Sequence, residues 1–207
     1  MNILLCLTML PVNYIAHQSE AGCDEAGRGC LAGPVCAAAV ILPEGYVHPL
    51  LNDSKKLSHA IRMRLREDIL QQAVNYAIAM VYPEEIDRIN ILQASILAMH
   101  KALDQLTIKP GHILVDGNYF KLYHNIPHKT MVKGDSRFAN IAAASILAKT
   151  SRDLYMEELH ASYPHYNWSK NKGYPTVEHR NAIRTFGICD YHRKSFQLLP
   201  AQISLDL

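Results

Sequence analysis

Short apolar runs alternate along the chain with longer stretches in which apolar residues recur at helical spacing. The runs rich in β-branched and small apolar residues predict strands at residues 20–25, 35–42, 74–82, 112–115 and 129–132. The second of these strands carries three consecutive alanines at 37–39, which indicates that another element packs closely over it.

The stretches with helical spacing lie between and after these strands. Ser58 is expected to cap a helix that runs to about residue 72, and Pro83 is expected to open a second helix that continues to about residue 106. A long helix is expected from about residue 136 to 160, and a last one near 176–186. Strands followed by alternating helices and strands predict an α/β fold, a mixed sheet with flanking helices and a C-terminal helical segment.

Length and composition fit one medium-sized folded unit. The chain has 207 residues, of which 49% are hydrophobic, so disordered and low-complexity classes are excluded. Its 21 Lys and Arg residues against 19 Asp and Glu residues give a net charge of +2, which gives no sign of a strongly basic protein that coats nucleic acid.

The five cysteines are scattered, without a Cys-x-x-Cys pair, so a reducing compartment is expected rather than a disulfide framework or a structural zinc site. No run approaches the roughly 20 apolar residues of a membrane span, and no membrane association is expected. Residues 1–15 are apolar but lack a basic start, and we interpret them as a first strand or a start-site extension rather than a secretory signal.

Acidic residues stand where predicted strands end: Asp24 with Glu25, then Asp116, then Asp135. In α/β sheets, ligands bind where strands end, so these side chains are expected to converge on one site. Neighbouring residues on a strand point to opposite faces, so Asp24 and Glu25 share one site only if the strand bends, a freedom that Gly27 supplies.

A cluster of carboxylates is tolerated only if cations occupy it or if some members are protonated. Such oxygen ligands suit Mg²⁺ or Mn²⁺, and paired ions activate water for phosphoryl displacement. The spacing also fits an interpretation without any metal site. An Asp-Gly pair such as Asp116-Gly117 is often only a turn, and acidic residues at a strand end are often only exposed to solvent.

Two further segments have chemistry suited to nucleic acid. The glycines of Gly27-Arg28-Gly29 let the backbone approach a ligand closely, and Arg28 is suited to binding a phosphate. Residues 168–174 (WSKNKGY) interleave aromatic and basic side chains, which suits either stacking on a nucleotide or a loop whose Tyr166 and Trp168 pack on the core. His179, His192 and Arg193 are spaced too loosely for a metal site, and we interpret them as surface groups or as supports for other residues.

Several sequence blocks together resemble the ribonuclease HII family, in the order in which that family carries them. They are residues 21–34 (AGCDEAGRGCLAGP), 53–57 (DSKKL), 114–117 (LVDG), 133–135 (KGD), 142–153 (AAASILAKTSRD) and 172–174 (KGY). The resemblance implies an RNase H-like mixed sheet, with residues 1–160 as the catalytic core and 161–207 as a helical, basic segment that completes the same domain. It also implies an endonuclease that cuts RNA in RNA–DNA hybrids and acts 5′ of single ribonucleotides embedded in duplex DNA, leaving 3′-hydroxyl and 5′-phosphate ends.

The resemblance also implies roles for individual residues. The family's metal-binding, catalytic carboxylates correspond to Asp24, Glu25, Asp116 and Asp135. By the same resemblance, a turn that reads the ribonucleotide 2′-hydroxyl corresponds to Gly27, Arg28 and Gly29. A tyrosine that stacks on the following deoxyribose corresponds to Tyr174, and a residue that would contact a phosphate corresponds to Lys55. Asp153 lies inside the long helix and is interpreted as a supporting residue rather than a ligand.

By the same resemblance we expect a cytoplasmic monomer that uses two Mg²⁺ or Mn²⁺ ions, one near Asp24 and Asp116 to activate water and one near Asp135 to stabilise the departing 3′ oxygen. The sequence stops soon after residues 192–196, so we expect it to lack the extra helices that follow there in longer members. Its last residues, Gln202 to Leu207, resemble the tails that dock on bacterial sliding clamps, although a tail that only packs or frays fits the pattern as well.

Two alternatives remain open at this stage. A sister hybrid nuclease would use the same carboxylates but need longer stretches of RNA, and the Gly-Arg-Gly turn with Tyr174 favours the first interpretation over it. A non-catalytic hybrid-binding module is the other alternative. Four intact carboxylates argue against it, because binding alone gains nothing from negative charge that faces phosphates.

Overall fold

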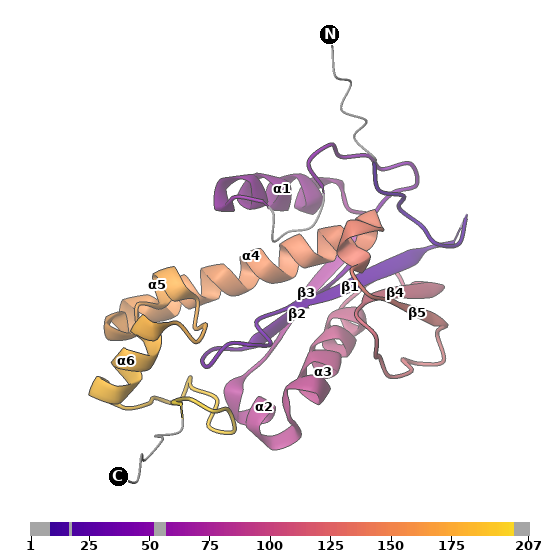
Figure 1. The fold of residues 1–207 in the computed structure, drawn as a ribbon. Helices are drawn as coiled ribbons and strands as arrows, with labels where there is room; N and C mark the ends of the chain where they lie inside the picture. The colour runs from indigo at the N-terminus through magenta and orange to yellow at the C-terminus, as the bar shows by residue number, and fades with distance from the viewer. Residues whose placement is uncertain (1–8, 17, 52–56, 201–207) are drawn as a thin grey trace, which may run out of the picture.

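The computed structural model describes residues 9–16, 18–51 and 57–200, and within them the strands form one mixed sheet. Its strands are β1 (Glu20–Ala26), β2 (Val35–Ile41), β3 (Asn75–Val81), β4 (His112–Asp116) and β5 (His128–Met131). The strand order is β3-β2-β1-β4-β5, with β2 antiparallel to β1 and β3, and with β4 parallel to β1 and β5 (Figure 1). Each strand predicted from the apolar runs is therefore present, with ends that differ by no more than one residue.

Helices cover both faces of this sheet. They are α1 (His59–Gln72), α2 (Pro83–Ile89), α3 (Ile91–Asp104), α4 (Ala139–Ser162), α5 (Trp168–Asn171) and α6 (Val177–Phe186), with short 3-10 helices η2 (Gly134–Ser136) and η3 (Pro164–Tyr166). Figure 1 shows α1 and α4 on one face, α2 and α3 on the other, and α5 and α6 at the far end of α4. Among the described helices, none is long and apolar enough to cross a membrane.

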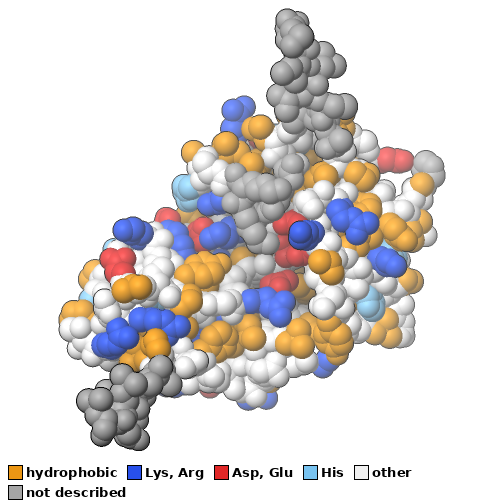
Figure 2. All heavy atoms as spheres, in the orientation of Figure 1, with side chains coloured by type: hydrophobic (Ala, Val, Ile, Leu, Met, Phe, Trp, Pro, Cys, Tyr) orange, Lys and Arg blue, Asp and Glu red, His pale blue; other side chains and the backbone are white. Residues whose placement is uncertain are grey.

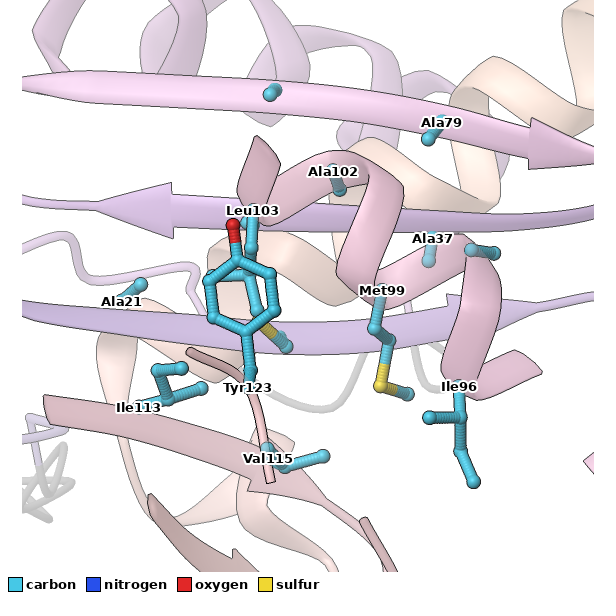
Figure 3. Close-up of a cluster of buried hydrophobic side chains, with 14 of the residues drawn as sticks. Ala21, Ala37, Ala79, Ile96, Met99, Ala102, Leu103, Ile113, Val115 and Tyr123 are labelled. Atoms are coloured by element: carbon cyan, nitrogen blue, oxygen red, sulfur yellow. The ribbon is translucent and has the colours of Figure 1, made fainter. Parts of the chain in front are cut away.

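Alternation along β2 divides the core into two layers. Ala37 and Ala39 face α3 and pack with residues such as Met99 and Leu103, as Figure 3 shows for one part of this layer. Ala38 and Val40 face the other way, into the layer that α1 and α4 cover. The prediction from the three alanines is thus confirmed, because helices pack closely on both faces of this strand.

The helix α4 also approaches the middle of the sheet closely. A Cβ atom on Gly22 of β1 would lie 2.2 Å from the carbonyl carbon of Asn140, so only glycine fits beneath the helix at that point. The buried Asn140 side chain donates to the carbonyls of Val12 and Glu20 and accepts from the amide of Leu42. These contacts fix α4 against the start of β1.

Two predicted helices differ from the structure. The helix expected over 83–106 is broken at Asn90, whose φ of 66° and ψ of 163° end α2, while its side chain caps α3 by accepting from the amides of Leu92 and Gln93. The long helix begins at Ala139 rather than near residue 136, because η2 turns the chain first. In addition, the described part of residues 1–15 contains no strand, so the first-strand interpretation finds no support there.

The C-terminal segment has a small hydrophobic core of its own against the end of α4. Tyr166 and Trp168 are fully buried in it, with rings stacked 4.9 Å apart, and they pack with Met156 of α4. Of the two interpretations of this aromatic and basic run, the packing one is therefore correct for these two rings. Tyr174 differs, because 39% of its surface is exposed.

Candidate active site

Parallel pairing of β1 and β4 brings two of the predicted acidic residues together. Cys23 pairs with Val115, so Asp24 and Asp116 follow side by side where the parallel pairing of the two strands ends. Asp116 is anchored there, since its Oδ1 accepts from the amide of Gly134 at 2.7 Å. The same contact holds η2, which carries the buried Asp135, beside the end of β4.

The bend expected at the acidic pair lies further along the chain. β1 stays regularly paired with β2 through Ala26, and the chain turns at Gly27, whose φ is 91°. Asp24 therefore lies on the α4 face, where Ser145 hydrogen-bonds it, while Glu25 lines a pocket on the α3 face together with Asp116. The sequence pattern did not indicate Ser145, because a serine inside a helix carries no signal of its own.

The buried carboxylates repel one another electrostatically. Burial raises the pKa of Asp24 well above its ordinary value, and the neighbouring charges of Glu25 and Asp116 raise it further. Burial also raises the pKa of Glu25, against the opposing effect of Arg28, whose Nη1 lies 3.1 Å from Glu25 Oε1. Figure 2 shows acidic side chains gathered near the middle of one face, with Lys and Arg around them.

This donor set has the chemistry of a divalent-cation site but is not arranged as one. Hard carboxylate oxygens that raise one another's pKa suit Mg²⁺ or Mn²⁺. In the described residues, however, no three His, Cys, Asp or Glu side chains form a group that could hold a metal ion. Backbone amides occupy one oxygen each of Asp24 and Asp116, and Glu25 faces the other side of the sheet.

The Gly-Arg-Gly turn is fixed from behind by two buried arginines. Arg193 donates to the carbonyls of Gly27, Arg28 and Gly33 at 2.7, 2.8 and 3.0 Å. Burial lowers the pKa of Arg193 to about 10, which leaves the guanidinium charged at neutral pH. Arg152 lies so close that a Cβ atom on Gly27 would stand 2.0 Å from its Nε. Gly29 is exposed instead, and a Cβ atom there would meet nothing within 4 Å.

Tyr174 lies next to this turn. The amide of Leu31 donates to the carbonyl of Gly173 at 2.8 Å, and Arg152 bridges the two segments by donating to the carbonyls of Ala32 and Lys172. The guanidinium of Arg152 also lies 6.0 Å from the centre of the Tyr174 ring. The structure thus brings Tyr174 and the turn together, as the resemblance implies.

A polar groove extends away from Tyr174 between α1, α4 and α5. Its volume is about 500 Å³, and Lys149, Asp153 and Lys170 are among the side chains that line it. Asp153 is buried and paired with Lys149 at 2.5 Å, which agrees with the supporting role expected for it.

Lys55 lies outside the described residues, as do Gln202 to Leu207, so their predicted contacts stay predictions.

The interpretation of His179, His192 and Arg193 as surface groups is wrong. All three are fully buried, and each hydrogen-bonds within the C-terminal segment or to the turn. Sequence reasoning missed them because histidines and arginines are ordinarily exposed, and because their partners are backbone carbonyls, which leave no pattern in the sequence. Their supporting role, which was the other part of that interpretation, agrees with these contacts.

Comparison with known proteins places this arrangement in a family. The family model for ribonuclease HII matches residues 21–199. The chain belongs to the ribonuclease HII family. A ribonuclease HII of Parabacteroides distasonis is 62% identical over 186 residues, which cover 90% of this chain and 94% of that protein.

Solved structures of ribonuclease HII relatives share the fold. The ribonuclease H2 of Pyrococcus horikoshii matches with a TM-score of 0.69 and 25% identity, covering 87% of this chain and 94% of that one. The ribonuclease HII of Archaeoglobus fulgidus, solved in a complex with PCNA, matches with a TM-score of 0.71 and 24% identity, covering 89% of this chain and 98% of that one. The RNase H-like fold class is thereby confirmed, and the chain is a nuclease, a phosphodiester hydrolase.

Proposed function

We propose that this protein hydrolyses the RNA strand of RNA–DNA hybrids and cuts duplex DNA on the 5′ side of a single embedded ribonucleotide, leaving 3′-hydroxyl and 5′-phosphate ends. The observation that carries the proposal is the fixed neighbourhood of the Gly-Arg-Gly turn and Tyr174, beside the acidic ends of β1 and β4. The 2′-hydroxyl is the group that distinguishes RNA from DNA, and reading it needs exposed backbone at close range. Gly29 supplies such backbone.

Asp24, Glu25, Asp116 and Asp135 are the residues that would hold divalent ions, Mg²⁺ or Mn²⁺. When bound, such ions supply an activated water and stabilise the departing 3′ oxygen. The protein's own groups do the rest. Arg28, whose side chain is 49% exposed, is placed to meet a phosphate in front of Glu25, and the Tyr174 ring offers a flat face to a sugar.

The two other interpretations are weaker on the same observations. A turn and a tyrosine held at fixed spacing suit recognition at a single sugar, which favours the proposed activity over that of a nuclease that needs longer RNA. A module that only binds hybrid would place positive charge opposite phosphate, whereas the strand ends present carboxylates that raise one another's pKa.

Docking of Gln202 to Leu207 on a sliding clamp is a separate proposal. It rests on the sequence pattern, since the complex with PCNA is a property of the Archaeoglobus protein.

The test is cleavage of a DNA duplex that contains one ribonucleotide, with Mg²⁺ or Mn²⁺ and with an all-deoxy duplex as the control. We expect one cut on the 5′ side of the ribonucleotide, loss of cutting in EDTA, and a loss of at least about a thousandfold in Asp116→Asn, as for removal of a group that acts in the transition state. Glu158→Gln is the matched control, because it removes an exposed acid far from the strand ends. Full activity of Asp116→Asn, or binding without turnover by the wild-type protein in manganese, would contradict the proposal.

A further inference from the structure

Two elements of the proposed site, the turn and Tyr174, are supported by one short segment near the C-terminus. Arg193 donates to three carbonyls of the turn region. Its own amide donates to the carbonyl of Leu31, and the preceding residue, His192, forms an isolated β-bridge with Ala32. The segment therefore lies directly behind the loop that follows β1.

His192 also leads to Tyr174 through a second buried histidine. The Nε2 atoms of His192 and His179 lie 3.3 Å apart, and Nδ1 of His179 lies 3.0 Å from the carbonyl oxygen of Tyr174. Trp168 Nε1 donates to His179 Nε2 at 3.0 Å. Both histidines are fully buried.

The partners determine which ring nitrogens carry the protons. Trp168 is only a donor, so Nε2 of His179 accepts, and its Nδ1–H donates to the Tyr174 carbonyl. The amide of Cys189 donates to Nδ1 of His192, so His192 donates from Nε2 to His179. Both histidines are neutral in this arrangement, the single lone pair of His179 Nε2 is shared between the Trp168 and His192 donors, and the chain of bonds ends on the backbone of Tyr174.

We infer that His179, His192 and Arg193 are positioning residues that set the spacing between the Gly-Arg-Gly turn and Tyr174. Arg193 fixes the turn, and His192 fixes Tyr174 through His179, from adjacent positions in the chain. A ribose is read by both elements only when that spacing is kept, so these residues act on substrate discrimination without touching substrate. The inference rests on the proposed function, which assigns the reading of the sugar to the turn and to Tyr174.

A matched pair of substitutions at His179 separates positioning from simple core packing. An asparagine amide reaches about as far as Nδ1, so His179→Asn keeps a donor for Tyr174. A glutamine amide reaches about as far as Nε2, so His179→Gln keeps a partner for Trp168 but loses the bond to Tyr174. We expect His179→Gln to lower kcat/KM on the single-ribonucleotide duplex about tenfold, the equivalent of one hydrogen bond, and His179→Asn to stay within about threefold of wild type.

A double-mutant cycle with Tyr174→Ala shows whether His179 acts through Tyr174. In that background the Asn and Gln variants should cleave equally, because there is no ring left to position. Two results would overturn the inference. One is equal activity of His179→Asn and His179→Gln when Tyr174 is present, and the other is an activity difference between them that persists undiminished in the Tyr174→Ala background. If His179→Gln does not fold, Arg193→Lys replaces it, because the three donors of an ammonium start from one atom and do not span the three carbonyls that Nε, Nη1 and Nη2 of Arg193 reach, and the same Tyr174→Ala background is used.

Hydrogen exchange keeps the inference distinct from the proposed function. The amide of Thr176 donates to the Tyr174 carbonyl at 2.8 Å, so its exchange should speed up in His179→Gln and not in His179→Asn. Failure of the wild-type protein to cut an embedded ribonucleotide would count against the proposed function alone. Equal exchange of Thr176 in both variants would count against the positioning role, whatever the activity.

Discussion

At the scale of single residues, the two glycines that flank Arg28 play different parts. Gly27 has a φ of 91° and no room for a Cβ atom beside Arg152, whereas a Cβ atom on Gly29 would point into open space. We expect Gly27→Ala to lower the free energy of unfolding by about 2–3 kcal/mol, from backbone strain and the displaced guanidinium. Gly29→Ala should change it by less than about 0.5 kcal/mol and yet reduce cleavage at least about tenfold, because the added methyl group occupies the space that a ribose needs.

Urea unfolding and cleavage of the single-ribonucleotide duplex measure the two effects separately. Equal stability of the two alanine variants would show that Arg152 yields to a side chain at Gly27. Wild-type cleavage by Gly29→Ala would show that the sugar approaches elsewhere. The roles proposed for Asp24 and Gly29 could be inferred from sequence because motifs carry these residues. Those of Arg152 and Arg193 could not, because these side chains satisfy carbonyls brought together only by the fold.

At the scale of elements, Asn90 marks a place where a continuous helical pattern becomes two helices. Its φ of 66° and ψ of 163° lie in a region that only glycine adopts readily, and its side chain accepts from two amides at the start of α3. We expect Asn90→Ala to lower the free energy of unfolding by about 2 kcal/mol, because the cap is lost and the strain remains. Asn90→Gly should be nearly neutral, since lower strain offsets the lost cap.

Chemical unfolding of both variants, followed by circular dichroism, measures this difference. If Asn90→Ala were as stable as Asn90→Gly, α2 and α3 would be free to join, and the break would have no energetic basis in this residue. The apolar spacing of 83–106 could not reveal the break, because residues on both sides of it keep the helical period. The strands were easier to predict, since short apolar runs end where the sheet ends.

At the scale of the whole molecule, the sequence predicted the layers but not the joint between the C-terminal segment and the sheet. The continuous apolar runs of the strands and the alanines of β2 indicate a sheet covered on both faces, and the structure has one. The joint depends on buried polar groups, Arg152, Arg193 and the histidine pair, whose spacing in the chain shows no periodicity. It is also where the turn and Tyr174 meet, so the least predictable contacts support the most function-specific part of the fold.

The same joint makes stability depend on pH. Burial, with the neighbouring His179, lowers the pKa of His192 to about 4, against about 6.5 in the unfolded chain. Between these two pKa values the unfolded state therefore binds more protons than the folded state. The contribution of neutral His192 to the free energy of unfolding is complete above pH 6.5. It is lost as the pH falls toward 4, and the loss amounts to up to about 3 kcal/mol. Urea midpoints measured from pH 7.5 to 4.5 should decline in the wild-type protein more steeply than in His192→Gln, which keeps a polar side chain but cannot titrate. Carboxylates such as Asp24 titrate in both proteins, so the difference between the two curves measures the effect of protonating His192. Parallel curves would mean that the buried histidine pair takes up its proton without unfolding.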